Sequence, residues 1–382
     1  MKQEKLSAKQ IQNLLAMFNP QYYSTEHVEA ILHWPPQQTM ELLEKTELSV
    51  FEEETLVKKA PAEIVEAYIK KHKGLSIVAQ IALIRRGDKE LIDCFRRSTF
   101  YGFSSAAEPE LIRSFKCDAE FWWKEYFHYH KLEGSAEIAL IDRHDIKLLM
   151  LYLDKESWSN DACMRLLTTY NVEAIGRLVS EHPRFYLTKE AEAYFVAKMR
   201  EDVVYSYISR HQLDIPAQVA LVKRGDHGLI MYYLKYYRFN SVEAVTGLAK
   251  RSVYDEVAEA LKKSPLPGEA QIAIINNSND KLFSLLIKKQ KLIPSAELVL
   301  AKGGYKPKRH KRIMQYLSLR SIEDADALEI ILKRGNSEEI KASIRRKCFN
   351  KSIIPTLLIK RGRKDEIELY LSIYHPGWKI PE

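Results

Sequence analysis

The sequence predicts an all-α protein, a right-handed superhelix (α-solenoid) of about twelve two-helix repeats with a cap at each end. Three observations support this prediction. A motif recurs about every 27 residues, apolar side chains occupy fixed positions in it, and a turn signal divides each copy into two helices. When positions are numbered from the residue, usually small, that opens the motif, the copies begin at residues 52, 79, 107, 136, 162, 191, 217, 244, 270, 296, 327 and 354.

Three apolar positions mark the core of the predicted repeat. Position 5 is apolar in all twelve copies, for example Leu83, Leu140 and Leu221. Positions 14 and 18 are apolar in nearly all copies, and their spacing of four places them on one face of a helix. Glu120 is an exception at position 14. A constant period with one apolar face is typical of an array in which each copy buries its stripe against its neighbours.

A turn signal separates the two helices of each copy. Position 9 is glycine in five copies, at Gly87, Gly225, Gly304, Gly335 and Gly362. Glycine commonly ends a helix in the left-handed conformation. The next residue is often Asp88, Asp145, Asp226 or their asparagine equivalents, and these side chains are good N-caps. We therefore expect a first helix of about nine residues and a second of about twelve.

Two copies depart from this pattern. The copy that begins at Ala107 has Phe115 in place of the turn glycine, so we expect local distortion there. The copy that begins at Ala296 gains four residues within the segment 303–312, after which Ile313 and Leu317 return to positions 14 and 18. This copy therefore carries an inserted loop.

Both ends of the chain depart from the repeat. Residues 1–51 break the register, and the segments 10–18, 25–32 and 39–46 predict three irregular helices that cap the first repeat. The repeats are expected over residues 52–375. The tail 376–382 contains Pro376, Gly377 and Pro381 and cannot continue a helix. Trp378 is expected to fold back over the last repeat.

Tandem helix pairs with these apolar positions and a capped turn resemble the α-solenoid class that includes HEAT and armadillo repeats. The resemblance covers residues from about 52 to 375 and concerns architecture. HEAT and armadillo repeats are about 40–47 residues long, so a period of about 27 departs from them. The resemblance implies partner binding along an extended surface, and it assigns no individual functional residue.

The composition is ordinary for a folded protein that does not insert into a membrane. Apolar residues make up 46% and charged residues 29% of the chain. We find no run of about twenty apolar residues and no signal-peptide core after the polar start MKQEKLSAKQ, and we expect a cytoplasmic monomer. The four cysteines form no CxxC pair, so the sequence implies no metal site and no cofactor.

Basic residues recur at positions 7 and 8, just before the turn. The candidates for partner binding are Arg85, Arg86, Lys223, Arg224, Lys250, Arg251, Lys333, Arg334, Lys360 and Arg361. The inserted loop adds Lys306, Lys308, Arg309, Lys311 and Arg312. Cations in the last turn of a helix interact favourably with its dipole, by about 0.3–1 kcal/mol. Stacking of the copies would also align these cations along one edge, where an acidic partner would meet them.

Aromatic residues are frequent at position 17 and form a local excess near residue 235. Position 17 includes Trp123, Tyr207 and Tyr316, and we expect these rings to pack between second helices with the tyrosine hydroxyls reaching water. The cluster consists of Tyr232, Tyr233, Tyr236 and Tyr237, which are more tyrosines than one helix face can bury. Tyr232, Tyr236 and Tyr237 are therefore candidates for a contact surface.

Three classes of function are compatible with the sequence. The first is a non-catalytic scaffold that binds an acidic protein or peptide. The second is a nucleic-acid-binding protein that uses the basic turns, in line with a pI near 9.0. The excess of 59 basic over 51 acidic residues is modest for this role. The third is an enzyme with a cleft near Trp122 and Trp123, although we find no phosphate loop, nucleophile elbow or metal cluster.

Overall fold

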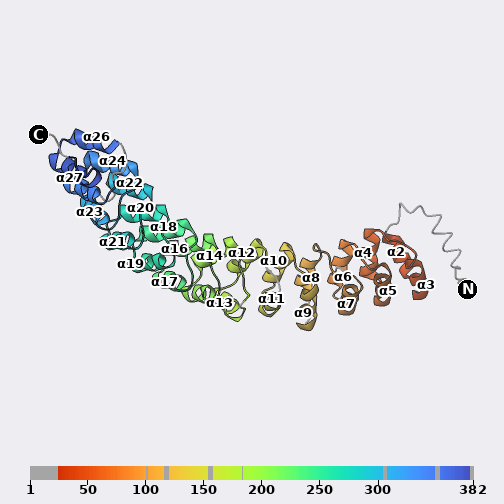
Figure 1. Cartoon of the computed structure of the whole chain (residues 1–382). Coiled ribbons are helices and arrows are strands. Elements are labelled where there is room, and N and C mark those ends of the chain that lie inside the picture. Colours follow the sequence, from red (N-terminus) through yellow and green to blue (C-terminus); the bar gives the residue numbers. More distant parts are fainter. Residues whose placement is uncertain are drawn as a thin grey trace, which may run out of the picture. The chain divides into compact units, whose positions relative to one another are not determined.

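The computed structural model describes residues 25–99, 102–115, 120–153, 158–182, 184–303, 308–348 and 353–378. Over these residues the protein is all-α, with 26 helices and no β-strand (Figure 1). None of these helices is both long and apolar enough to cross a membrane. The chain divides into two units, Met1–Ala191 and Glu192–Glu382, with the boundary inside one helix.

The helices are all short. The first unit contains α2 (Thr25–Leu32), α3 (Pro36–Leu43), α4 (Val50–Lys59), α5 (Ala62–His72), α6 (Ile77–Arg86), α7 (Lys89–Ser98), α8 (Glu108–Ser114), α9 (Glu120–Tyr129), α10 (Gly134–Asp142), α11 (Ile146–Leu153), α12 (Asn160–Thr169) and α13 (Val172–Glu181). The boundary lies in α14 (Lys189–Lys198). The second unit continues with α15 (Glu201–Ile208), α16 (Ile215–Arg224), α17 (His227–Tyr236), α18 (Val242–Arg251), α19 (Tyr254–Lys263), α20 (Gly268–Asn276), α21 (Asp280–Lys289), α22 (Pro294–Lys302), α23 (Arg309–Leu319), α24 (Ala325–Arg334), α25 (Ser337–Arg345), α26 (Ile353–Arg361) and α27 (Lys364–Tyr374).

Within each unit, a helix packs mainly on the helix two places further along the chain. In the first unit α4 packs on α6 and α5 on α7, and in the second α18 packs on α20 and α17 on α19. Even-numbered and odd-numbered helices therefore form two rows, as Figure 1 shows. From α4 onward the even-numbered helices are the first helices of the motif copies and the odd-numbered ones are the second. The helices α2 and α3 pack on α4 and α5 in the same way.

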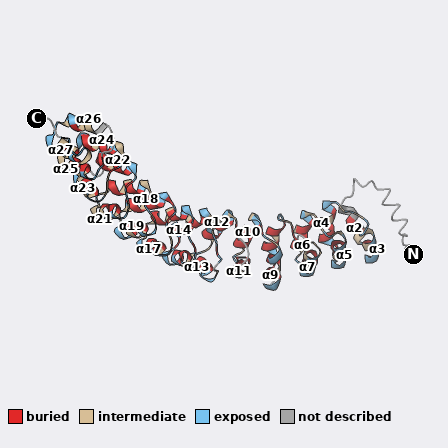
Figure 2. Ribbon diagram, in the orientation of Figure 1, coloured by how far each residue is buried: buried red, intermediate tan, exposed pale blue. Residues whose placement is uncertain are grey.

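The predicted apolar stripes form the core between the rows (Figure 2). Every position-5 side chain is at most 2% exposed, from Leu56 at 0% to Leu358 at 2%. Burial of a leucine of this kind contributes about 1.5–3 kcal/mol to folding. Short helices are marginal in isolation, so the stability of each pair depends on its neighbours.

The turn prediction is confirmed at most of the described copies. Gly87, Gly225 and Gly362 have φ of 73°, 82° and 69°, the left-handed conformation that glycine adopts without strain. The Asp88 carboxylate accepts hydrogen bonds from the amides of Glu90 and Leu91, and Asp145, Asn171, Asp226 and Asn336 cap their helices in the same way. Gly304 lies outside the described residues.

The prediction of a left-handed glycine is wrong at Gly335, whose φ is −69°. A side chain at this position would collide with the carbonyl oxygen of Ile331. Glycine is required here by a close approach of the backbone rather than by φ.

The copy that begins at Ala107 shows a displaced second helix. Its helix α9 begins at Glu120, and Tyr126, not Trp123, makes the contact that position 17 makes elsewhere, donating to the Glu108 carboxylate at 2.8 Å. The assignment of Trp123 to position 17 is therefore wrong. With a shift of three residues, Trp123 and Phe127 take positions 14 and 18, where both are 2% exposed. The apparent break at Glu120 disappears because Glu120 takes position 11 in the shifted register, and Trp123 takes position 14.

Candidate partner-binding surface

The arginine at position 8 joins successive helix pairs. Arg86, at the end of α6, donates through Nη1 to the carbonyl oxygens of Val57 at 2.8 Å and Ala60 at 2.7 Å. These two carbonyls close the C-terminal end of α4, the first helix of the preceding pair. The last carbonyls of a helix have no partner within it and carry the negative end of its dipole. The guanidinium group gives these carbonyls a hydrogen-bond donor and places a positive charge at the negative end of the dipole. It does so across the interface between two helix pairs.

The same contact recurs in both units. Arg143 Nη1 donates to Ile112 O at 2.6 Å and Phe115 O at 3.0 Å, Arg224 Nη1 to Val196 O at 2.9 Å and Met199 O at 2.5 Å, and Arg361 Nη1 to Leu332 O at 2.7 Å. Arg251 Nη2 donates to Gly225 O at 2.9 Å. In each case the acceptors are positions 6 or 9 of the preceding copy. We find no such bond from Arg334, which is exposed, to any described residue. The position-8 cation therefore interacts with the dipole of the first helix in the preceding pair, as well as with the dipole of its own helix.

The segment predicted as an inserted loop supplies the same contact where position 8 cannot. The loop prediction is wrong for Arg309 to Arg312, which form the first turn of α23. The copy that begins at Ala296 has Gly303 at position 8. Arg312, only 1% exposed, donates through Nη1 to Ile275 O at 2.7 Å, at the end of α20. Its Nη2 and Nε donate to the Asp280 carboxylate at 3.0 and 3.2 Å, and its guanidinium carbon lies 5.1 Å from the centre of the Phe283 ring. Arg312 is therefore an internal residue and is not accessible to a partner.

Most other described cations of this loop also contact the chain itself. Arg309 donates to Ala301 O at 3.0 Å and to the buried Glu339 carboxylate at 3.2 Å. Lys308 Nζ lies 2.9 Å from Asp280 Oδ2, and this hydrogen bond is the main cause that lowers the pKa of Asp280 below its usual range. Lys311 is 73% exposed and contacts Asp280 only at 3.7 Å. Lys306 lies outside the described residues.

The cations at position 7 remain at the surface. Arg85, Lys223 and Lys333 are exposed and pair with surface glutamates Glu110, Glu243 and Glu329. Lys250 and Lys360 are also exposed. Surface ion pairs contribute about 0–1 kcal/mol, so these glutamates do not prevent position 7 from contacting a partner.

In eight copies position 2 carries an acid or amide that the sequence reasoning missed, half-buried at Glu53 and buried in the other seven. Its members are Glu53, Gln80, Glu108, Glu137, Glu192, Gln218, Gln271 and Glu297. The Glu192 carboxylate accepts from the Tyr207 hydroxyl at 3.0 Å and from the Asp214 amide at 2.7 Å. Gln218 instead donates to Leu213 O and accepts from the Asn240 amide, both at 2.8 Å. Position 2 thus anchors the loop that leads to the next pair. A count of acids and amides at this position would have revealed it.

The prediction that position-17 hydroxyls reach water is wrong where position 2 is glutamate. Tyr207 and Tyr316 are at most 1% exposed and donate to Glu192 and Glu297. Burial also raises the pKa of Glu192, and that of Glu108, to about 7.

The second helices of the Glu192–Glu382 unit carry an open groove of about 810 Å³. The charged residues that line it are Asp255 of α19, Asp280, Lys281 and Lys288 of α21, and Lys311 of α23, together with Tyr254. Asp280 is paired with Lys308 and Arg312. Lys281 and Lys288 are exposed, and no acidic side chain of the described residues lies within ion-pair distance of either. We call this the lysine groove.

A row of tyrosines occupies the same face of the preceding second helices. The rings of Tyr205 and Tyr232 are 3.9 Å apart, and those of Tyr232 and Tyr236 are 5.1 Å apart. Tyr205 and Tyr236 are exposed at 44% and 54%. Tyr232 shares position 16 with Leu285 of the lysine groove. Since α15, α17, α19, α21 and α23 pack in sequence, the row and the groove lie along one face.

Tyr237 does not belong to this row. It is half-buried, and its ring lies 5.2 Å from that of the buried Tyr233. The predicted tyrosine cluster therefore divides into Tyr232 and Tyr236, which join Tyr205 on the outer face, and Tyr237, which packs beside the core.

Comparison with protein-family models, curated proteins and solved structures finds no match for this chain. Its description rests on architecture. The chain is an all-α protein whose described helices pack on neighbouring helices in a manner compatible with a helical repeat.

Proposed function

We propose that this chain is a right-handed α-solenoid of twelve two-helix repeats, and that it acts as a non-catalytic scaffold. Its partner would be an acidic segment of another protein, bound along the second helices of the Glu192–Glu382 unit. The proposal includes a monomeric, cytoplasmic protein without a cofactor. The pairing of helices two places apart supports the architecture, because this is how stacked repeats bury their stripes.

The lysine groove is the observation that carries the proposal. It presents Lys281, Lys288 and Lys311 on a hollowed surface, next to the exposed rings of Tyr205 and Tyr236. Tyrosine offers a large contact area with little loss of side-chain freedom. Lys281 and Lys288, which have no acidic side chain of the described residues within ion-pair distance, attract carboxylates. Such a surface suits an extended acidic peptide.

Nucleic-acid binding along the basic turns is less well supported. That alternative depends on both cations of positions 7 and 8, but most position-8 arginines and Arg312 donate to carbonyls of the chain itself. The position-7 cations then remain for nucleic acid, one exposed cation in each of these turns, and several of them pair with a glutamate. We therefore favour an acidic polypeptide as the partner.

Reversal of the groove charges is expected to weaken binding of an acidic peptide. We expect a short fluorescein-labelled peptide rich in glutamate to bind the full chain, and Lys281→Glu combined with Lys288→Glu to weaken binding roughly tenfold or more, about 1.4 kcal/mol. Both side chains are exposed, so the fold should be retained. Fluorescence anisotropy measures the affinity.

The matched control reverses two exposed lysines of position 7 in the same unit, Lys223→Glu with Lys250→Glu. It should change the affinity by less than about twofold. A larger loss in this control than in the groove variant would place binding at the turns. Tighter binding of duplex DNA or RNA than of the peptide, with a steep loss between about 50 and 200 mM salt, would favour the nucleic-acid alternative.

A further inference from the structure

The helix pair α26–α27 leaves uncovered a surface that all other copies of the motif bury. Position 6 shows this most clearly. It is at most 4% exposed in eleven copies, as Val57, Ile84, Ile112, Ile141, Leu167, Val196, Val222, Ala249, Ile275, Ala301 and Leu332. In the last copy it is Ile359, which is 65% exposed. Ile359 is thus an apolar side chain of the same type that the described residues leave uncovered.

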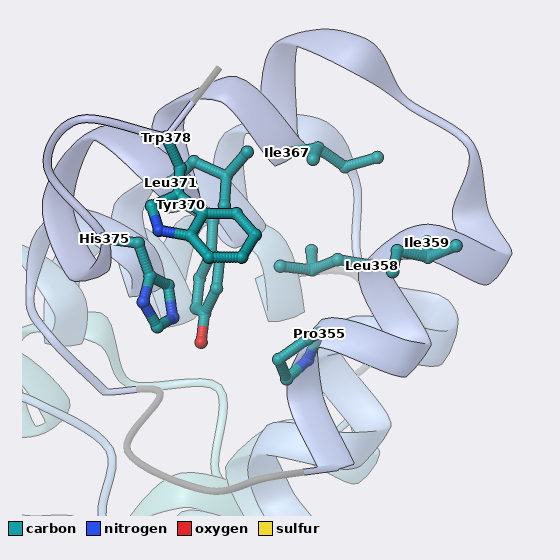
Figure 3. A pocket seen from close by; sticks show the side chains of 8 residues that line it. All are labelled: Pro355, Leu358, Ile359, Ile367, Tyr370, Leu371, His375 and Trp378. Atoms are coloured by element: carbon teal, nitrogen blue, oxygen red, sulfur yellow. The ribbon is translucent and has the colours of Figure 1, made fainter. Parts of the chain in front are cut away.

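An apolar pocket of about 230 Å³ lies at this surface. Figure 3 shows Leu358, Ile359 and Pro355 on the α26 side and Tyr370 with Trp378 on the α27 side. The centre of the His375 ring lies 5.9 Å from that of Tyr370 and 6.2 Å from that of Trp378. Trp378 lines the pocket but is itself 72% exposed. We call the surface formed by these residues the end face.

The occupant that fits the end face is a helix. The end face continues the packing interface of the unit, in which α20 is covered by α22, α22 by α24 and α24 by α26. Each of these covering helices presents an apolar stripe to the same motif positions. An amphipathic helix that lies in a hydrophobic groove uses residues three and four apart as anchors.

The charges around the pocket indicate the sign of the charge that the bound helix should carry. Arg363 and Lys364 are 55% and 78% exposed at the start of α27, and Arg363 lies 4.0 Å from the buried Glu366. Lys360 is exposed at the end of α26. The nearby acids are engaged, since Asp365 pairs with Lys341, and Glu368 lies 3.9 Å from Lys364. The rim therefore favours a helix with acidic residues beside its apolar stripe.

We infer that the end face binds an amphipathic helix of an acidic partner, whose apolar side chains insert between Ile359 and Trp378. This site is separate from the lysine groove and does not depend on the function proposed for it. The helix extends the packing of the unit by one further element. Exposed apolar surface of this kind is typical of interaction sites.

The test uses the full chain and a fluorescein-labelled synthetic helix, cross-linked to stay helical, with leucines on one face and glutamates elsewhere. We expect saturable binding and a blue shift of Trp378 emission, because binding covers the indole ring. Ile359→Glu should weaken binding roughly tenfold or more, about 1.4 kcal/mol. Ile359 is exposed, so this substitution is compatible with folding.

Three controls keep the two binding sites apart. Val242→Glu changes another exposed apolar residue, at 50% exposure, and should leave binding unchanged. Lys281→Glu with Lys288→Glu should also leave it unchanged, even if it abolishes peptide binding in the groove. A peptide of the same composition with leucines scattered around the helix should bind weakly.

The inference would be overturned if the synthetic helix does not bind at all, or if it binds and Ile359→Glu does not weaken its binding. It would also be overturned by concentration-dependent self-association of the chain that Ile359→Glu abolishes. That result would make the end face a contact between copies of this chain.

Discussion

Arg312→Ala is expected to lower the free energy of unfolding of the Glu192–Glu382 unit by about 3 kcal/mol. The guanidinium group is buried, and it is held by the Ile275 carbonyl and the Asp280 carboxylate. Its removal leaves a buried acceptor unsatisfied and a void beside Phe283. Lys308 still pairs with Asp280, so the cost should stay below the upper range for a buried ion pair.

Guanidinium denaturation, combined with hydrogen exchange of peptides that cover α20 to α23, measures this effect. The matched control is Lys311→Ala in the same turn of α23, which changes an exposed cation and should cost less than about 0.5 kcal/mol. If Arg312→Ala unfolds like the unchanged protein but loses binding to an acidic peptide, the loop is a binding element and its structural role is wrong.

Glu192→Gln is expected to stabilise the same unit by about 3 kcal/mol near pH 8 and by little near pH 4. Burial raises the pKa of this carboxyl from the usual 4.5 to about 7 in the folded state. The protonated carboxyl therefore makes its full contribution to the free energy of unfolding below about pH 4.5. This contribution is lost as the pH rises through 7. Glutamine carries no charge to bury, and Gln218 shows that it can accept from the following loop.

Thermal or chemical unfolding of both proteins as a function of pH checks this expectation. The control is Glu243→Gln, which changes a glutamate that is 66% exposed and paired with Lys223, and it should show no such gain. An equal gain for Glu192→Gln at pH 4 and pH 8 would show that ionisation of Glu192 is not the cause.

The sequence was sufficient to predict the helix pairs and their buried stripes. Leu83 and Leu221 lie in the core because their spacing repeats, and Gly87 and Asp88 end one helix and start the next through local chemistry. The segment 25–32 was predicted as a helix and is α2 (Thr25–Leu32). Such features depend on residues close together in the chain, so they can be predicted from a single sequence.

The functions of the basic residues could not be predicted in the same way. Arg86 binds carbonyls of Val57 and Ala60, 26 to 29 residues earlier, so its role depends on how the pairs stack. Arg312 and Lys311 are adjacent and equally basic, yet one is buried and the other exposed. Trp123 was misplaced because the register assumed no extra residues before α9.

The most direct test of the account compares two adjacent arginines of α6, Arg86→Gln and Arg85→Gln. Arg86 joins two helix pairs, whereas Arg85 contacts only the surface Glu110 among the described residues. Hydrogen exchange of the amides in α4 and α6 should show a local loss of about 2 kcal/mol for Arg86→Gln and less than about 0.5 kcal/mol for Arg85→Gln. Equal losses, or no loss for Arg86→Gln, would contradict the claim that position-8 arginines hold successive helix pairs together.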